Sequence, residues 1–76
     1  MTLEDWMRNF GENLQDILHE KGLTQRMLSS MTGIPASTIS TYINGSVGPS
    51  AAAVVKIVYA IDADYFDLLD FGDTIE

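Results

Sequence analysis

Apolar residues recur at helical spacing along the first twenty positions of the chain. They fall three or four residues apart, as on one face of a helix: Leu3, Trp6, Met7, Phe10, Leu14, Ile17 and Leu18. Thr2 precedes this pattern as a candidate N-cap, and Glu4 and Asp5 lie in the first turn, where the helix dipole favours acids. Gly11 lowers helix propensity, so either one bent helix or two helical pieces fit the pattern.

A second apolar pattern begins after a candidate cap at Thr24. Its apolar residues again share one helical face: Met27, Leu28 and Met31. Gly33 stops this helix and Ile34 begins a turn. Pro35 can then open another helix, because a first helical position needs no N–H donor.

The helix that Pro35 opens has two different sides. Its inward side is apolar and consists of Ile39, Tyr42 and Ile43. Its opposite side is small and consists of Ala36, Ser37, Ser40 and Thr41, so it can approach another surface closely. Asn44-Gly45 ends the helix with residues that tolerate a left-handed backbone.

Two further helices follow a short loop. Ser50 is the candidate cap of a helix that runs through Ile61, with a core face of Val54, Ile57, Val58 and Ile61. The other side of this helix carries Ala52, Val55 and Tyr59, which indicate either a partner surface or simple helix propensity. A last short helix is predicted from Tyr65 to about Phe71, and we expect Phe66 and Phe71 to be left for a dimer contact. The fold class is therefore all-α, a compact bundle of five helices in one domain.

Charge is distributed unevenly along the 76 residues. The net charge of −7 argues against nucleic acid, because phosphate binding depends largely on lysine and arginine. Between Lys21 and Ile61, however, there is no acid, and the only charged residues there are Lys21, Arg26 and Lys56. Acidic ends that merely keep a small protein soluble explain the flanks, but they do not explain the acid-free middle.

Composition excludes several classes of function. The absence of cysteine removes disulfides and zinc fingers, and one histidine near a helix end, His19, is neither a metal site nor a catalytic constellation. We therefore expect no enzyme activity, no cofactor and no metal. No apolar run spans a bilayer and no basic signal-peptide start is present, so a cytoplasmic protein without membrane contact is expected.

The ordered series of residues from Phe10 to Leu69 resembles the DNA-binding domain of the phage repressor and Cro family, also called the XRE family. The matching residues are Gly22-Leu23-Thr24-Gln25, Leu28, Gly33-Ile34, Ser37-Thr38-Ile39-Ser40, Tyr42, Asn44-Gly45, Pro49-Ser50 and Lys56-Ile57. The resemblance implies a lambda-repressor-like bundle whose second and third helices form a helix-turn-helix. Residues 1–9 then become an N-terminal helical extension, in which Trp6 either packs over the core or contacts a partner. Residues 72–76 become an acidic tail.

The resemblance also implies the residues of a DNA site. The recognition helix would be 35–43, with base contacts from Ala36, Ser37, Ser40 and Thr41. Phosphate contacts would come from Thr24, Gln25, Arg26 and Asn44. None of the base-reading side chains makes the bidentate contacts of arginine or glutamine, so direct readout is expected to be modest.

Two functions follow from these observations. The leading one is a sequence-specific DNA-binding transcriptional regulator, such as a phage or mobile-element repressor or a Cro-like protein. It would bind double-stranded DNA as a homodimer on half-sites about one helical turn apart. The alternative is a protein-interaction module on the same fold, an antirepressor or antitoxin-like partner. Ala52, Val55, Tyr59, Phe66 and Phe71 are the candidate partner or dimer surface in either case.

Overall fold

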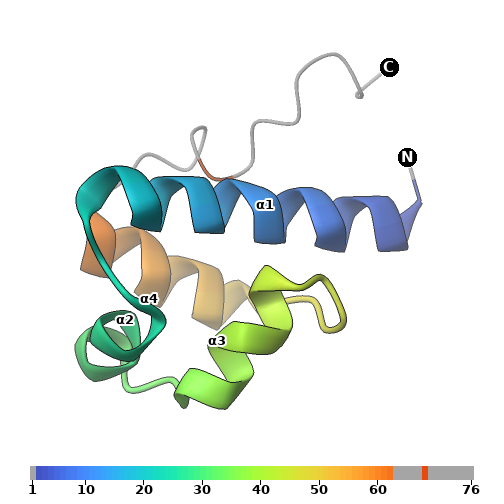
Figure 1. The fold of residues 1–76 in the computed structure, drawn as a ribbon. Coiled ribbons are helices and arrows are strands. Elements are labelled where there is room, and N and C mark those ends of the chain that lie inside the picture. Colours follow the sequence, from blue (N-terminus) through green and yellow to red (C-terminus); the bar gives the residue numbers. More distant parts are fainter. Residues whose placement is uncertain (1, 63–67, 69–76) are drawn as a thin grey trace.

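The computed structural model describes residues 2–62 and Leu68. Within them lie four helices and no strand: α1 (Leu3–Lys21), α2 (Gln25–Thr32), α3 (Ala36–Ile43) and α4 (Ala51–Ile61). The predicted all-helical class is confirmed, but the described residues hold four helices and not five. The predicted fifth helix, Tyr65 to about Phe71, lies outside the described residues except for Leu68. Figure 1 shows α1 running along one side of the molecule, with the three shorter helices gathered beneath it.

Helix starts follow the predicted caps. The hydroxyl of Thr2 accepts a hydrogen bond from Asp5 N, that of Thr24 from Met27 N, and that of Ser50 from Ala53 N, at 3.0, 3.0 and 3.1 Å. Each hydroxyl satisfies an amide that has no partner within its own helix. Local sequence therefore determines where α1, α2 and α4 begin.

Gly11 has a different role from the one expected. α1 is a single helix through this position, and the backbone end of α3 lies directly against it. A Cβ on Gly11 would collide with the carbonyl oxygens of Ile43 and Tyr42, the second at 2.5 Å. Glycine is thus required because two helices approach closely here, and not because α1 bends.

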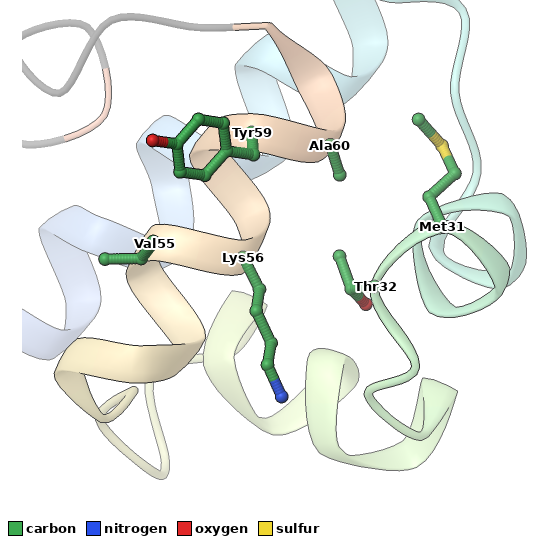
Figure 2. Close-up of a pocket in the computed structure, with 6 residues that line it drawn as sticks. All are labelled: Met31, Thr32, Val55, Lys56, Tyr59 and Ala60. Atoms are coloured by element: carbon green, nitrogen blue, oxygen red, sulfur yellow. The ribbon is translucent and has the colours of Figure 1, made fainter.

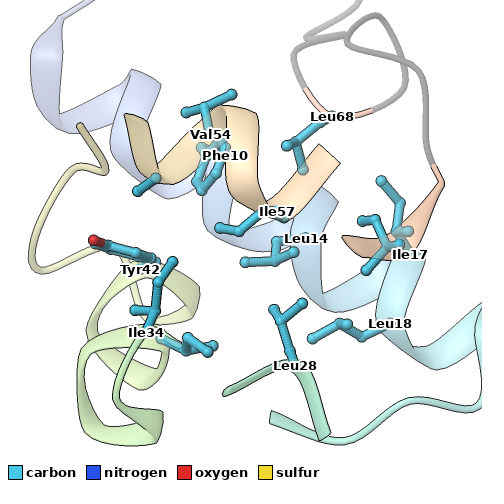
Figure 3. Packing of buried hydrophobic residues seen from close by; sticks show 13 residues of the cluster. Phe10, Leu14, Ile17, Leu18, Leu28, Ile34, Tyr42, Val54, Ile57 and Leu68 are labelled. Carbon is cyan, nitrogen blue, oxygen red and sulfur yellow. The ribbon is translucent and has the colours of Figure 1, made fainter. Parts of the chain in front are cut away.

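The core joins all four helices (Figure 3). Its fully buried side chains are Phe10, Leu14, Leu28, Ile39, Ile57 and Leu68. The amide Nδ2 of Asn13 also donates to the carbonyl oxygen of Leu68, at 2.9 Å. Trp6 packs partly buried against this core, with its ring stacked on Phe10 at a centroid distance of 5.6 Å. The structure thus supports the first of the two interpretations of Trp6.

The face that α2 presents to the core is rotated from the one predicted. Leu28 is buried, but Met27 and Met31 are 48% and 49% exposed. Thr32 takes an inward position instead, and its hydroxyl donates to the carbonyl oxygen of Leu28 at 2.8 Å. A hydroxyl satisfied in this way is tolerated near the core, which leaves the two methionines on the surface. Among the described residues, no helix is long and apolar enough to cross a membrane.

Candidate nucleic-acid interface

The outward side of α3 is polar and accessible. Ser37 is exposed, and Ala36, Ser40 and Thr41 are partly exposed, while Ile39 and Tyr42 on the other side are buried. The structure therefore brings the four predicted base-contact residues to one side of a helix. Pro35 provides no side-chain cap for the first turn of α3, and the Thr38 amide donates to the carbonyl oxygen of Pro35 at 3.0 Å.

One hydroxyl on this side is already engaged. Thr41 Oγ1 donates to the carbonyl oxygen of Thr38 at 2.6 Å. Its proton is used within the helix, so only its lone pairs and its methyl group face outward. Sequence reasoning missed this difference between Thr41 and Ser37, because both were assigned by position alone.

The start of α2 presents the second group of predicted residues. Thr24 serves as the N-cap, with its hydroxyl bound to Met27 N and its carbonyl oxygen bound to Leu28 N. Gln25 is half-buried and Arg26 is exposed. Gln25 helps to line a shallow hollow of about 210 Å³, shared with α1 residues that include Gln15 and Leu18. The first turn of α2 thus faces the second half of α1 across this hollow.

The end of α3 turns sharply into the loop before α4. Asn44 Oδ1 accepts a hydrogen bond from Ser46 N at 3.0 Å, and Gly45 has a φ of 79°. Asn44 itself is exposed. Residues 44–50 contain no basic side chain, so this turn offers a phosphate only polar groups.

The N-terminal part of α1 braces that turn. A Cβ on Gly45 would lie 3.1 Å from Arg8 Cα, and one on Gly48 would lie 3.2 Å from the Met7 side chain. Met7 and Arg8, which belong to the expected N-terminal helical extension, therefore contact the loop that follows α3. Glycines at positions 45 and 48 were the available signal, but they do not identify the partner helix.

Electrostatics near this turn centre on Arg8 and Asp5. Arg8 Nη2 lies 2.6 Å from Asp5 Oδ1, with side chains 62% and 42% exposed. Hydrogen bonds from the Thr2 backbone and hydroxyl, followed by the charge of Arg8, lower the pKa of the Asp5 carboxyl below its usual 3.8. The Asp5 carboxylate is charged at neutral pH, and its negative charge partly neutralises the positive charge of Arg8.

The outer side of α4 forms a separate accessible surface. Ala52, Val55 and Tyr59 are all exposed, and Tyr59 is 83% exposed. Next to them lies a pocket of about 410 Å³ between α2 and α4, lined by Met31, Thr32, Val55, Lys56, Tyr59 and Ala60 (Figure 2). Phe66 and Phe71, the other members of the predicted surface, lie outside the described residues.

Comparisons with known proteins agree with this arrangement. The family model described as "Helix-turn-helix" matches residues 14–64. The HTH-type transcriptional repressor RghR of Bacillus subtilis (strain 168) is 34% identical over 71 residues, which are 92% of this chain and 53% of the relative. The chain therefore spans about half the length of this curated relative. The crystal structure of the restriction-modification controller protein C.AhdI from Aeromonas hydrophila has a TM-score of 0.78 and 26% identity, covering 82% of this chain and 94% of that one.

Proposed function

Because the chain belongs to the helix-turn-helix family of DNA-binding transcriptional regulators, of the repressor and Cro (XRE) type, we propose that it binds a specific duplex with α3 in the major groove. The single observation that supports this most is the geometry of α2 and α3. α2 packs against α3, the small polar side of α3 is accessible, and the start of α2 and Asn44 at the end of α3 carry exposed polar residues. Repression is the mode that we propose, since the curated relative is named a repressor.

Base recognition would rest on hydroxyl and methyl groups. Ser37 is exposed at the N-terminal end of α3, and it is the strongest candidate for a hydrogen bond to a base edge. Thr41 has its proton bound to Thr38, so its contribution would be an acceptor and a methyl contact with thymine. Ala36 and Ser40 would set how closely the helix approaches the bases.

Phosphate contacts would fix the orientation of α3. The amides of the first turn of α2 and the side chain of Gln25 would hold one phosphate, as helix N-termini do. Asn44 would hold another, while Arg26 adds a charge and Thr24 keeps the α2 start in place. Because few charges take part, we expect a shallow dependence of affinity on salt.

A homodimer would supply the affinity that one domain lacks. We propose that the outer side of α4 forms its interface, with Ala52, Val55 and Tyr59 meeting the same residues of a second copy. Two copies would then read two half-sites about one helical turn apart. A protein-interaction module on the same fold is the alternative, and the same exposed surface is the observation that favours it.

Substitutions that separate the two kinds of contact test this function. Ser37→Ala and Thr41→Val should change the sequence preferred in competition between duplexes, with the larger change for Ser37. Gln25→Ala should instead weaken all duplexes about equally, because it removes a phosphate contact. If neither kind of variant alters binding, α3 is not the reading element. A wild-type protein that is not retained by DNA even at low salt would favour the protein-interaction module.

A further inference from the structure

The turn after α3 has no basic side chain of its own, but a base from elsewhere lies beside it. Arg8 of α1 is adjacent to Gly45, whose Cβ position would be 3.1 Å from Arg8 Cα and 3.4 Å from Arg8 N. Arg8 is also the only base among residues 1–20. We propose that Arg8 binds a DNA phosphate next to Asn44 and so supplies the charge that residues 44–50 lack. This inference rests on the proposed function.

The course of α1 places Arg8 in line with the other phosphate-binding groups. Gln15 and Leu18 of α1 line a hollow that they share with Gln25 at the start of α2. Gly11 lies against the carbonyl oxygens at the end of α3, and Arg8 lies about 4.5 Å further along the helix axis, at 1.5 Å per residue. One helix therefore passes the first turn of α2, then the end of α3, and then reaches Arg8.

A close backbone contact fixes the position of Arg8 beside Gly45. The backbone of Gly45 fits against that of Arg8 because glycine has no Cβ, and its φ of 79° suits glycine. Met7 similarly fills the space beside Gly48. The backbone of Arg8 is thus fixed beside Gly45, the residue that follows Asn44.

Asp5 leaves Arg8 able to bind a phosphate. Arg8 uses one guanidinium nitrogen on Asp5 Oδ1, and an arginine has five N–H donors. Asp5 is itself held by Thr2, so its position at the helix start does not depend on Arg8. An exposed pair of this kind is weak, and a phosphate can share or displace it.

The acidic residues around Arg8 explain why a phosphate would need a basic side chain in order to bind here. Glu4 and Glu12 lie one turn on either side of Arg8 and are exposed, and Asp5 is also charged. A phosphate approaching this side of α1 meets three acids and one base. Removing one acid should therefore strengthen DNA binding, whereas removing Arg8 should weaken it more than its charge alone would suggest.

Four variants test the proposal against a fluorescently labelled duplex of mixed sequence, over a range of salt concentrations. Arg8→Gln should weaken binding by about five- to tenfold at low salt and reduce the slope of log affinity against log salt by about 1. Asp5→Asn should strengthen binding about two- to fivefold. Arg8→Lys should keep most of the slope. The double variant Asp5→Asn with Arg8→Gln has the net charge of the wild type, yet it should still show the reduced slope.

Each outcome has a definite meaning. Equal affinity and slope for Arg8→Gln and the wild type would overturn the role of Arg8 while leaving the proposed function intact. A double variant that recovers the salt slope of the wild type would overturn it too, because net charge would then explain the effect. A wild type that binds no duplex at low salt removes the proposed function and this inference together. Thermal unfolding should be nearly unchanged in Arg8→Gln and Arg8→Lys, since Arg8 is exposed, and the two variants with Asp5→Asn should lose only the small stabilisation that the Asp5 carboxylate provides.

Discussion

The contact between α1 and the end of α3 is tightly packed, whereas the outer side of α4 is open to solvent. At Gly11 there is no room for even a methyl group, because two carbonyl oxygens of α3 lie against it. On α4, Tyr59 is 83% exposed and nothing within the described residues covers it. The first region fixes how α3 is held against α1, and the second is the surface that we propose for a second copy of the chain. Substitutions should accordingly damage folding in the first region and association in the second.

The largest effect is expected on association. Across the two-fold interface that we propose, Tyr59→Glu would place two carboxylates face to face, and it should weaken binding to an operator with two half-sites about a hundredfold, by loss of the second contact. Unfolding free energy should change by less than about 0.5 kcal/mol, because the side chain is exposed. Sedimentation and operator titration measure the two effects.

Leu3→Glu is the matched control for Tyr59→Glu. Leu3 is 72% exposed and lies at the far N-terminal end of α1, so the same new charge is added away from the α4 surface. We expect no change in the oligomeric state. If Tyr59→Glu leaves association unaltered as well, the outer side of α4 is not the dimer interface.

Gly11→Ala is the corresponding test of the close contact between α1 and the end of α3. The added methyl forces α3 away from α1, and we expect unfolding free energy to fall by about 2 kcal/mol, despite the better helix propensity of alanine. Denaturant unfolding measures this. Gln15→Ala, on an exposed position of the same helix, should change stability by less than about 0.5 kcal/mol. Equal stabilities for the two variants would show that α3 does not lie tightly against α1.

Capping residues allow a smaller and more selective comparison. Thr24→Ala and Thr2→Ala each remove a hydroxyl that accepts an amide hydrogen bond at 3.0 Å, so each should cost about 1 kcal/mol. Only Thr24 lies at the proposed phosphate site, so only Thr24→Ala should also weaken DNA binding at a temperature where both variants are folded. Equal loss of DNA binding in both variants would mean that the start of α2 does not contact DNA.

The smallest expected effect is the pH dependence of stability that arises from Asp5, in the first turn of α1. Because the folded-state pKa of Asp5 is lowered, its carboxylate stabilises the fold above its unfolded pKa of about 3.8, and this contribution is lost as pH falls through the folded value. The wild type should therefore lose slightly more stability than Asp5→Asn between about pH 5 and about pH 2. Unfolding curves at the two pH values measure the difference. Parallel losses would mean that the bonds from Thr2 and Arg8 to Asp5 do not stabilise the fold.

Sequence predicted those parts of the fold that depend on neighbouring residues. Thr2, Thr24 and Ser50 cap the helices that they were expected to cap, since each hydroxyl binds an amide three residues away. The inward residues of α3 and α4 also follow from helical spacing, as the burial of Ile39 and Ile57 shows.

Features that depend on how helices meet were not predictable in this way. Gly11 suggested a bend because its sequence gives no sign of the carbonyl oxygens opposite. Met27 and Met31 were expected inside, but α2 buries Leu28 and leaves both methionines exposed, while the partly buried Thr32 bonds its hydroxyl to the carbonyl oxygen of Leu28. For the proposed DNA site, the sequence predicted that the small polar residues share one accessible side of α3, but it did not show that the Thr41 hydroxyl is engaged.

Selection from a pool of random duplexes tests the central claim most directly, namely that α3 reads DNA as part of a symmetric dimer. The wild-type protein would be mixed with the pool at low and at moderate salt, and the bound sequences recovered. We predict enrichment of a palindrome with half-sites about one helical turn apart, and its loss with Ser37→Ala. No enrichment at either salt concentration would contradict the account and point to a protein partner for the outer side of α4.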